Sequence, residues 1–382
     1  MTLDLVSLAP SRILAVTRAA FDTPGTDILC FGESDQSAPA AAAHAARAAL
    51  AGGDALYPDV RGVFALRAAL ADHLTALHAN PVAESRIQVT ASGMAAVSVA
   101  LQSIVRAGDR VVLHGPAWPN TGNAALLRGA RVDTLPLDAL PSGRFALDLD
   151  RLAGLLRGAR AFVLNSPNNP TGWTATRAEL VAILALCRAE GVWLISDEVY
   201  SRLVYDGSRA APSVLDVAGP EDRVMVCNSF SKTWAMTGWR LGWIVLPEGA
   251  RPQVSEVVEV THSGTSPFAQ AGALAAVPDE AFVARFRAHC AEGRRVTMAG
   301  LAGLNGIRVA APDGAFYAFI GIDGLRDSLD FALRLVAGHG IAVAPGSAFG
   351  PEGEGFLRLC FARSADTMQR SIQKLRAGLQ AR

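Results

Sequence analysis

The sequence predicts an α/β protein with a large domain built on a mostly parallel central sheet and a smaller α+β domain. A chain of 382 residues is too long for one ordinary compact core. Its middle alternates short apolar runs with helical patterns, and from about Pro278 the pattern changes to a long charged helix, short strands and a terminal helix. We therefore predict a large domain over residues 38–277 and a small domain formed by residues 1–37 together with 278–382.

The predicted strands of the large domain are short buried runs that end in polar or turn residues: RVVLHGP, ARAFVLNSP, GVWLISDE, RVMVCNSF and RLGWIVLP. Helical patterns lie between or beside them, for example over residues 176–190, 95–105 and the Ala-rich stretch 38–51. Strands that alternate with helices favour a parallel sheet covered on both faces. Ligands of such sheets bind at the carboxyl ends of the strands, so the polar residues that follow these runs are the candidate site.

Composition and charge exclude several classes of function. Acidic and basic residues balance at 35 each, which leaves no electrostatic footprint for nucleic acid or an acidic membrane. The start, Met1 to Asp4, lacks the features of a secretory signal, and no apolar run approaches the roughly 18 residues of a membrane span. We expect a cytoplasmic protein without a metal site, because the cysteines are scattered and without CxxC spacing, as is typical of reduced thiols: Cys30, Cys187, Cys227, Cys290 and Cys360.

The chain contains only two lysines, Lys232 and Lys374, so 33 of its 35 basic residues are arginines. A lysine kept in such a chain is a candidate for chemistry that a guanidinium cannot perform, such as addition to an aldehyde. Lys374 lies in the polar terminal helix SIQKLRAGLQAR, and we interpret it as a solvated charge. Lys232 lies among apolar residues in SFSKTWAM and is the candidate for chemistry.

Three motifs follow predicted strands in order: NSPNNPTG over residues 165–172, SDEVY with Asp197 and Tyr200, and NSFSKTWAMTGWRLGW with Ser229, Lys232 and Arg240. Taken singly, the first can be a simple turn and the acid of the second a helix cap. A cap explains the third poorly, because it gathers a hydroxyl, an amine and a guanidinium. Their joint occurrence, each after a strand, favours a functional site.

These motifs resemble those of the class I/II aminotransferase family, the aspartate aminotransferase-like enzymes of fold type I that use pyridoxal 5′-phosphate (PLP). FGESD, YPDVRG, TASGMAAV and FLRLCFA extend the resemblance collinearly from about Leu29 to the C-terminus. The resemblance implies PLP as cofactor. It also implies transfer of the amino group of an L-α-amino acid to a 2-oxo acid by a ping-pong mechanism through an aldimine on Lys232.

The resemblance also implies roles around the cofactor ring. Lys232 matches the lysine that forms the aldimine and then acts as the base at the substrate's α-carbon. Asp197 matches the acid that keeps the pyridine nitrogen protonated. Asn169 and Tyr200 would donate hydrogen bonds to the phenolic oxygen, and Trp118 would stack on the ring, although it can also be a structural residue of its loop. The implied catalytic residues are thus Lys232, Asp197 and Tyr200.

The phosphate would be bound at the N-terminus of the helix that TASGMAAV opens, where backbone N–H groups are free. Tyr57 of YPDVRG matches a tyrosine that reaches the phosphate of the neighbouring subunit, which implies a homodimer with shared active sites. The implied phosphate ligands are the backbone of Gly93, Met94 and Ala95 and the side chains of Ser229 and Arg240.

Arg358 in FLRLCFA resembles the arginine that binds the substrate's α-carboxylate through a bidentate fork. Its alternative is a strand-edge arginine in an ion pair. Gly32 in FGESD would belong to a loop that closes on the substrate. Trp118 and Asn169 would also contact the substrate. No arginine matches a clamp for a distal carboxylate, so specificity for aspartate is not implied.

Two alternatives stay open at this stage. A C–S β-lyase, a decarboxylase or another PLP enzyme of the same fold would share every cofactor residue. A PLP-sensing transcription regulator would need a basic winged-helix module and a linker before this domain, whereas the domain begins almost at Met1.

Overall fold

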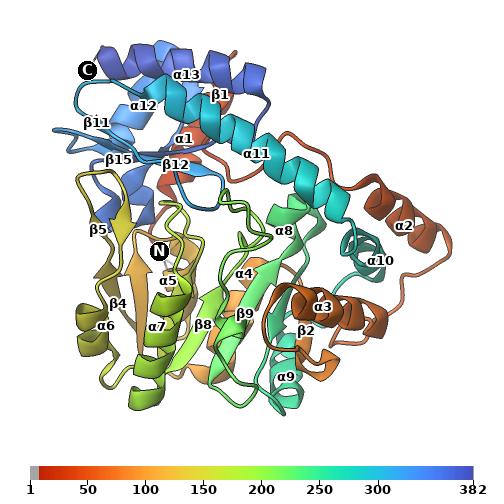
Figure 1. Ribbon diagram of the computed structural model, residues 1–382. Coiled ribbons are helices and arrows are strands. Elements are labelled where there is room, and N and C mark those ends of the chain that lie inside the picture. Colours follow the sequence, from red (N-terminus) through yellow and green to blue (C-terminus); the bar gives the residue numbers. More distant parts are fainter. Residues whose placement is uncertain (1–7, 382) are drawn as a thin grey trace, which may run out of the picture.

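The computed structural model describes residues 8–381, so the expectation about Met1 to Asp4 lies outside the described residues. A seven-stranded sheet forms the lower part of the molecule in Figure 1. Six strands run in one direction and β10 runs antiparallel to both of its neighbours. The order across the sheet is β2 (Ile87–Thr90), β10 (Gly242–Val245), β9 (Val224–Ser229), β8 (Trp193–Asp197), β7 (Ala161–Asn165), β3 (Arg110–Gly115) and β4 (Arg131–Pro136).

Side chains of this sheet alternate between two apolar layers. Val111 and Leu113 of β3 belong to one layer, and Val112 between them belongs to the other. The period of two along each strand therefore buries both faces, as a parallel sheet requires. One layer includes α4 (Gly93–Ile104), α5 (Pro119–Leu127) and α9 (Arg251–His262); the other includes α3 (Phe64–Leu77), α6 (Leu149–Leu156) and α7 (Arg177–Glu190).

The upper part of the molecule holds a four-stranded sheet in the order β11 (Ile307–Arg308), β12 (Tyr317–Ile322), β15 (Phe356–Cys360) and β14 (Ala344–Pro345). The N-terminal segment joins this part, because β1 (Asp27–Ile28) pairs in parallel with β13 (Ile341–Ala342). The domain bounds 38–277 and 1–37 with 278–382 stay a prediction. The surrounding helices are α1 (Arg12–Phe21), α11 (Glu280–Leu301), α12 (Ser328–His339) and α13 (Ala365–Gln380).

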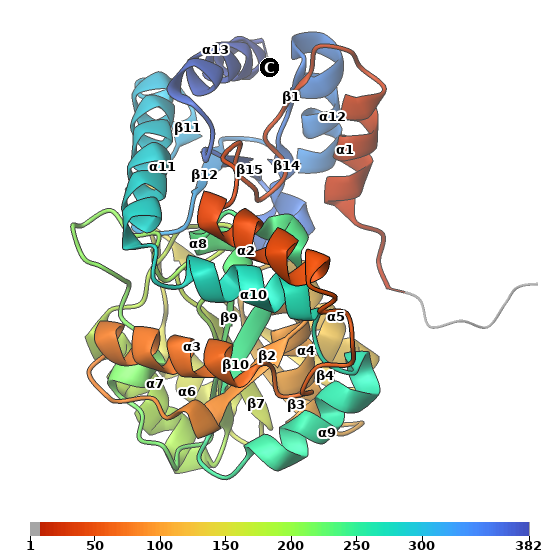
Figure 2. The ribbon, with the colours of Figure 1, turned by 90° about the vertical axis from the view of Figure 1, so that its right-hand side faces the viewer.

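Two helices lie side by side between these parts, α2 (Ala40–Ala51) and α10 (Pro267–Ala276), as Figure 2 shows. Gly272 permits their approach, because a Cβ there would lie 2.9 Å from the carbonyl of Ala42. Short elements complete the chain: the antiparallel pair β5 (Asp138–Ala139) and β6 (Phe145–Ala146), and the single turn of helix α8 (Phe230–Thr233).

The five strands predicted from apolar runs are all present, as are the helices predicted over 38–51, 95–105 and 176–190. The mostly parallel sheet is confirmed. The five cysteines are buried and free, as predicted. Among the described residues no helix is long and apolar enough to cross a membrane.

The interpretation of Lys374 is wrong. Its ammonium donates to the carbonyls of Gly25 at 3.0 Å and Gly340 at 3.2 Å, and it lies 3.2 Å from the carboxylate of Asp27. Gly340 is the C-cap of α12, where backbone carbonyls lack helical partners and attract a cation. Lys374 is therefore a structural charge that ties α13 to the N-terminal segment and α12.

Candidate active site

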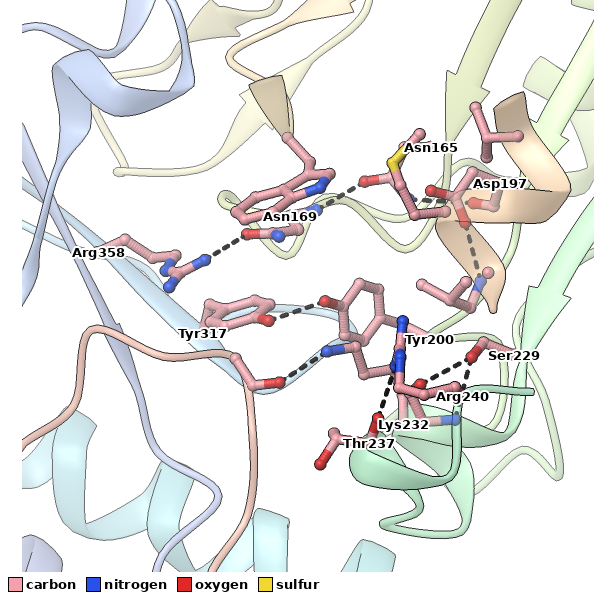
Figure 3. Close-up of a pocket in the computed structure, with 17 residues that line it drawn as sticks. Asn165, Asn169, Asp197, Tyr200, Ser229, Lys232, Thr237, Arg240, Tyr317 and Arg358 are labelled. Atoms are coloured by element: carbon pink, nitrogen blue, oxygen red, sulfur yellow. Dashed lines mark hydrogen bonds between the residues drawn. The ribbon is translucent and has the colours of Figure 1, made fainter. Parts of the chain in front are cut away.

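Strands β7, β8 and β9 end side by side, and the last residue of each contributes to one cavity. These residues are Asn165, Asp197 and Ser229. The cavity has a volume of about 240 Å³, and residues from both the seven-stranded and the four-stranded sheet line it (Figure 3). Its lining consists of Gly32, Gly93, Met94, Val97, Trp118, Asn165, Asn169, Asp197, Val199, Tyr200, Ser229, Ser231, Lys232, Thr237, Arg240, Tyr317 and Arg358.

Every residue singled out from the sequence lines this cavity except Ala95 and Tyr57. The amide of Ala95 is occupied, because it donates to the side chain of Ser92, the N-cap of α4, at 2.9 Å. Tyr57 is 95% exposed in the single chain. The lining residues that sequence reasoning missed are Val97, Asn165, Val199, Ser231, Thr237 and Tyr317.

Lys232 projects from α8 into the cavity. Its amine donates to the carbonyl of Gly32 at 2.6 Å and lies 5.7 Å from the ring centres of both Tyr200 and Phe316. Burial disfavours the ammonium form and lowers the pKa of Lys232 to about 8. Near neutral pH a useful fraction of this amine is therefore unprotonated and able to act as a nucleophile or a base.

Asp197 carries the opposite perturbation. Burial raises the pKa of its carboxyl to about 7, although the backbone N–H of Val199, 3.3 Å from Oδ1, acts against the shift. No cation forms an ion pair with Asp197 among the residues that the structure describes. An ionised carboxylate here lacks the partner that would offset its desolvation, so the position suits a cationic ligand group.

The N-terminus of α4 lies beside the end of β9. A Cβ at Gly93 would lie 2.9 Å from the Cβ of Ser229 and 3.2 Å from Val199, so only glycine permits this approach. Ser229 donates to the carbonyl of Leu241 at 3.0 Å. Arg240 is held in a left-handed conformation with φ of 56° and donates to the carbonyl of Thr237 at 2.6 Å. Free N–H groups, hydroxyls and a guanidinium make this end of the cavity suitable for an anion.

Arg358 stands at the other end of the cavity, 1% exposed, on β15. One terminal nitrogen donates to Oδ1 of Asn169 at 3.0 Å and the other donates to the carbonyl of Cys30, whereas Nε has no partner among residues 8–381. No acid of the described chain pairs with it, contrary to the alternative of a structural ion pair. A buried guanidinium without a carboxylate partner is chemically suited to bind the carboxylate of a ligand.

Asn165 organises the turn that carries Asn169. Its Oδ1 accepts the backbone N–H of Asn169 at 2.8 Å, and its Nδ2 donates to the carbonyl of Asp197 at 3.0 Å. The asparagine at the end of β7 thus connects the NPTG turn to the end of β8. The sequence offered a signal for it, since it begins the motif NSPNNPTG at a strand end.

Several classes of enzyme could use such a cavity, and comparison with known protein families identifies the class. The family model described as "Aminotransferase class I and II" matches residues 26–375. The chain belongs to the class I and II aminotransferases. Members of this family are PLP-dependent enzymes of fold type I, which confirms the family resemblance, the fold class and the aminotransferase function.

Curated relatives of this aminotransferase differ in substrate. The arginine–pyruvate transaminase AruH of Pseudomonas aeruginosa is 33% identical over 91% of this chain and 88% of its own. The aspartate aminotransferase of Thermotoga maritima is 32% identical over 94% and 93% of the two chains. Among solved structures, an aminotransferase from Mycobacterium tuberculosis matches with a TM-score of 0.92 at 31% identity, covering 100% of each chain.

Proposed function

We propose that this aminotransferase binds PLP at the cavity of Figure 3 and moves the amino group of an L-α-amino acid to a 2-oxo acid by a ping-pong reaction. The observation that carries the proposal is the presence of a buried amine, Lys232, and a buried acid without a cationic partner, Asp197, in one cavity. Arg358 adds a buried cation that no carboxylate among residues 8–381 neutralises.

The residues present fit PLP at two points. Gly93, Met94, Ser229 and Arg240 form an anion site for the phosphate. Asp197 lies where a protonated pyridine nitrogen would relieve the cost of its burial. When bound, PLP would supply an aldehyde that accepts the substrate's amino group. It would also supply a protonated ring that withdraws electrons from the substrate's α-carbon.

The chain's own groups would then perform the proton transfers and hold the reactants. Lys232, with a lowered pKa, would act as the base that removes the proton from the substrate's α-carbon. Asn169 and Tyr200 would hold the phenolic oxygen of PLP, and Trp118 would pack against its ring. Arg358 orients the substrate by its α-carboxylate, so that the α-hydrogen faces Lys232.

We further propose a homodimer in which Tyr57 completes the phosphate site of the neighbouring subunit. Tyr57 and Leu56 are 95% and 83% exposed, and Val260 on α9 is 90% exposed. The loop that follows α9 lies against the same segment, since a Cβ at Gly264 would lie 3.2 Å from Pro58. Large apolar side chains exposed on neighbouring segments support an interface there.

The amino donor is proposed to carry an uncharged side chain. A second cavity of about 880 Å³ adjoins the first and shares Gly32, Trp118 and Arg358 with it. Apolar residues line much of it: Leu8, Ala9, Pro10, Ile13, Leu14, Phe31 and Ala348. Besides Arg358, its charged residues are Arg12, which is exposed to solvent, and Glu354, whose Oε1 accepts the backbone N–H groups of Ser328 and Gly355 at 2.8 and 3.0 Å.

Steady-state rates test these proposals over a panel of amino donors, with 2-oxoglutarate and pyruvate as acceptors. We expect leucine, methionine or phenylalanine to exceed aspartate in kcat/KM by about tenfold or more, since burying such a side chain contributes about 1.5–3 kcal/mol. Highest activity with aspartate would contradict the proposed side-chain class alone. Release of pyruvate from an S-substituted cysteine without any oxo-acid acceptor would instead favour the β-lyase. A cytoplasmic location is proposed together with this metabolic role.

A further inference from the structure

Tyr317 lines the cavity between Arg358 and Tyr200 (Figure 3). It begins β12, is 1% exposed, and its hydroxyl lies 2.7 Å from the hydroxyl of Tyr200. The face of its ring lies 4.3 Å from the guanidinium carbon of Arg358 (Figure 3). We propose that Tyr317 is a positioning residue that sets the direction of the Tyr200 hydroxyl and holds the plane of Arg358, an inference that rests on the proposed function.

The hydroxyl of Tyr317 has a single hydrogen-bond partner within residues 8–381, which is Tyr200. Gly32 lies close against this oxygen, because a Cβ at Gly32 would lie only 2.0 Å from it. Gly32 must therefore be glycine for its loop to pass over this hydroxyl. The same residue accepts the Lys232 amine through its carbonyl at 2.6 Å, so Tyr317 also supports the loop that holds the resting lysine.

The direction of the shared hydrogen bond follows from the number of protons. Burial raises the pKa of both phenols, so each keeps its O–H. Two hydroxyls in contact use one proton between them and leave the other free. Because Gly32 lies close against the Tyr317 oxygen, we infer that Tyr317 donates the shared hydrogen bond to Tyr200. Tyr200 then directs its own proton into the cavity, and accepting a hydrogen bond makes it a stronger donor.

The segment before Tyr317 is held in place on three sides. Ala315 is fully buried with φ of +59°, a left-handed conformation that residues other than glycine rarely adopt. Its carbonyl accepts the hydroxyl of Tyr205 at 2.5 Å, and the N–H of Gly314 donates to the carbonyl of Gly172 in the NPTG turn at 3.1 Å. The carbonyl of Phe316 accepts the N–H of Phe361. Such a constrained turn is expected where a side chain must be aimed accurately.

The ring of Tyr317 has a separate role from its hydroxyl. Together with Phe349, whose ring centre lies 4.8 Å from the same guanidinium carbon, it packs against Arg358. The two terminal nitrogens of Arg358 are fixed by Asn169 and Cys30, so the rings complete the restraint on the guanidinium plane. A fork held in one plane loses less freedom when it binds a carboxylate.

Three variants separate these roles: Tyr317→Phe removes the hydroxyl, Tyr317→Leu removes the ring as well, and Tyr205→Phe is the matched control. Tyr205 donates a hydrogen bond to the same segment from outside the cavity, so its loss affects the fold of the segment alone. In each PLP-loaded variant we would measure the pH dependence of the cofactor's visible absorbance, kcat and KM, and the melting temperature. Affinity for 3-phenylpropionate, a carboxylate without an amino group, gives a binding measurement that does not depend on turnover.

For Tyr317→Phe we expect the absorbance transition to move up by about half a unit to one unit, because a weaker Tyr200 donor stabilises the ionised phenolic oxygen less. Its affinity for 3-phenylpropionate should stay near that of the wild type. For Tyr317→Leu we expect the same shift and, in addition, about a 2- to 30-fold loss of affinity for 3-phenylpropionate with a matching rise in KM. Tyr205→Phe should lower the melting temperature and leave both the transition and the affinity unchanged.

The role of Tyr317 toward Tyr200 would be overturned if the absorbance transition of Tyr317→Phe matched that of the wild type. It would also be overturned if Tyr205→Phe shifted the transition by the same amount. Unchanged carboxylate affinity in a folded Tyr317→Leu variant would overturn the role toward Arg358. Failure of the proposed function has a different signature: the wild-type protein itself would then take up no PLP that borohydride can attach covalently.

Discussion

Replacing Asp197 by asparagine should stabilise the cofactor-free protein while it removes most of the activity. The carboxyl has a pKa of about 7 in the folded chain, against 3.8 for an unperturbed aspartate. At 1.36 kcal/mol per unit, a rise of about three units corresponds to at most about 4 kcal/mol of destabilisation once the group is ionised in both states. Asparagine keeps an oxygen for the N–H of Val199 and carries no charge, so it avoids this cost.

The dependence on pH gives the sign of the effect. The carboxyl of Asp197 has a higher pKa in the folded chain than in the unfolded chain, so its favourable contribution to stability is fully present below about pH 4. This contribution is lost as the pH rises to about 7. The stability difference between the Asp197→Asn variant and the wild type should therefore grow from pH 5 to pH 8. His73 and His114, whose pKa values burial lowers to about 4, act in both proteins and cancel from the difference.

Urea unfolding of both apoproteins at pH 5 and pH 8 measures this difference, with Asp72→Asn as a control on the exposed side of α3. Addition of PLP should raise the melting temperature of the wild type more than that of Asp197→Asn, because only the carboxylate pairs with a protonated pyridine. An apo Asp197→Asn variant no more stable than the wild type at pH 8 would refute the claim that the buried carboxylate lacks a partner.

Three further predictions concern the amine, the carboxylate clamp and the dimer. Lys232→Ala should still bind PLP but lose the absorbance that borohydride abolishes in the wild type, and its turnover should fall by several orders of magnitude; full activity would exclude the role of Lys232. Arg358→Lys should lower kcat/KM by about 2–4 kcal/mol, mainly through KM, with PLP affinity near normal in a spectroscopic titration. Mixing inactive Lys232→Ala and Tyr57→Arg subunits should restore some activity, because one site of each mixed dimer then carries neither defect. No recovery despite demonstrated subunit exchange would count against Tyr57 acting across the interface.

The part of the site that the sequence predicts best lies at strand ends. Asp197 and Ser229 follow apolar runs that could only be buried strands, and parallel strands bring their carboxyl ends together. The motif after each run then identified Lys232 and Asn169 by residue type. Local sequence determined these positions, because strand, turn and side chain all lie within a few residues of one another.

Tyr317 is the missed lining residue that lies outside the quoted motifs. It stands within GAFYAFIGI, where an aromatic residue in an apolar run is typical of a core strand. Its function depends on the left-handed backbone at Ala315 and on contacts with Tyr200 and Arg358, which are 117 and 41 residues away in sequence. No pattern of period two or 3.6 contains that information. The other missed lining residues, in contrast, lie within motifs quoted from the sequence: Val97, Asn165, Val199, Ser231 and Thr237.

The scarcity of lysine can be interpreted from the two positions where a lysine remains. Lys232 occupies a cavity where burial lowers its pKa to about 8, and a guanidinium there would stay charged and could not act as nucleophile or base. Lys374 directs one compact ammonium at two carbonyls, of Gly25 and Gly340, and at the Asp27 carboxylate. Three acceptors around one nitrogen match the three N–H bonds of an ammonium, whereas a guanidinium spreads its donors over a planar fork. In a chain that uses arginine for 33 of its 35 basic residues, Lys374 thus remains where three acceptors match an ammonium, and Lys232 remains where we propose the chemistry.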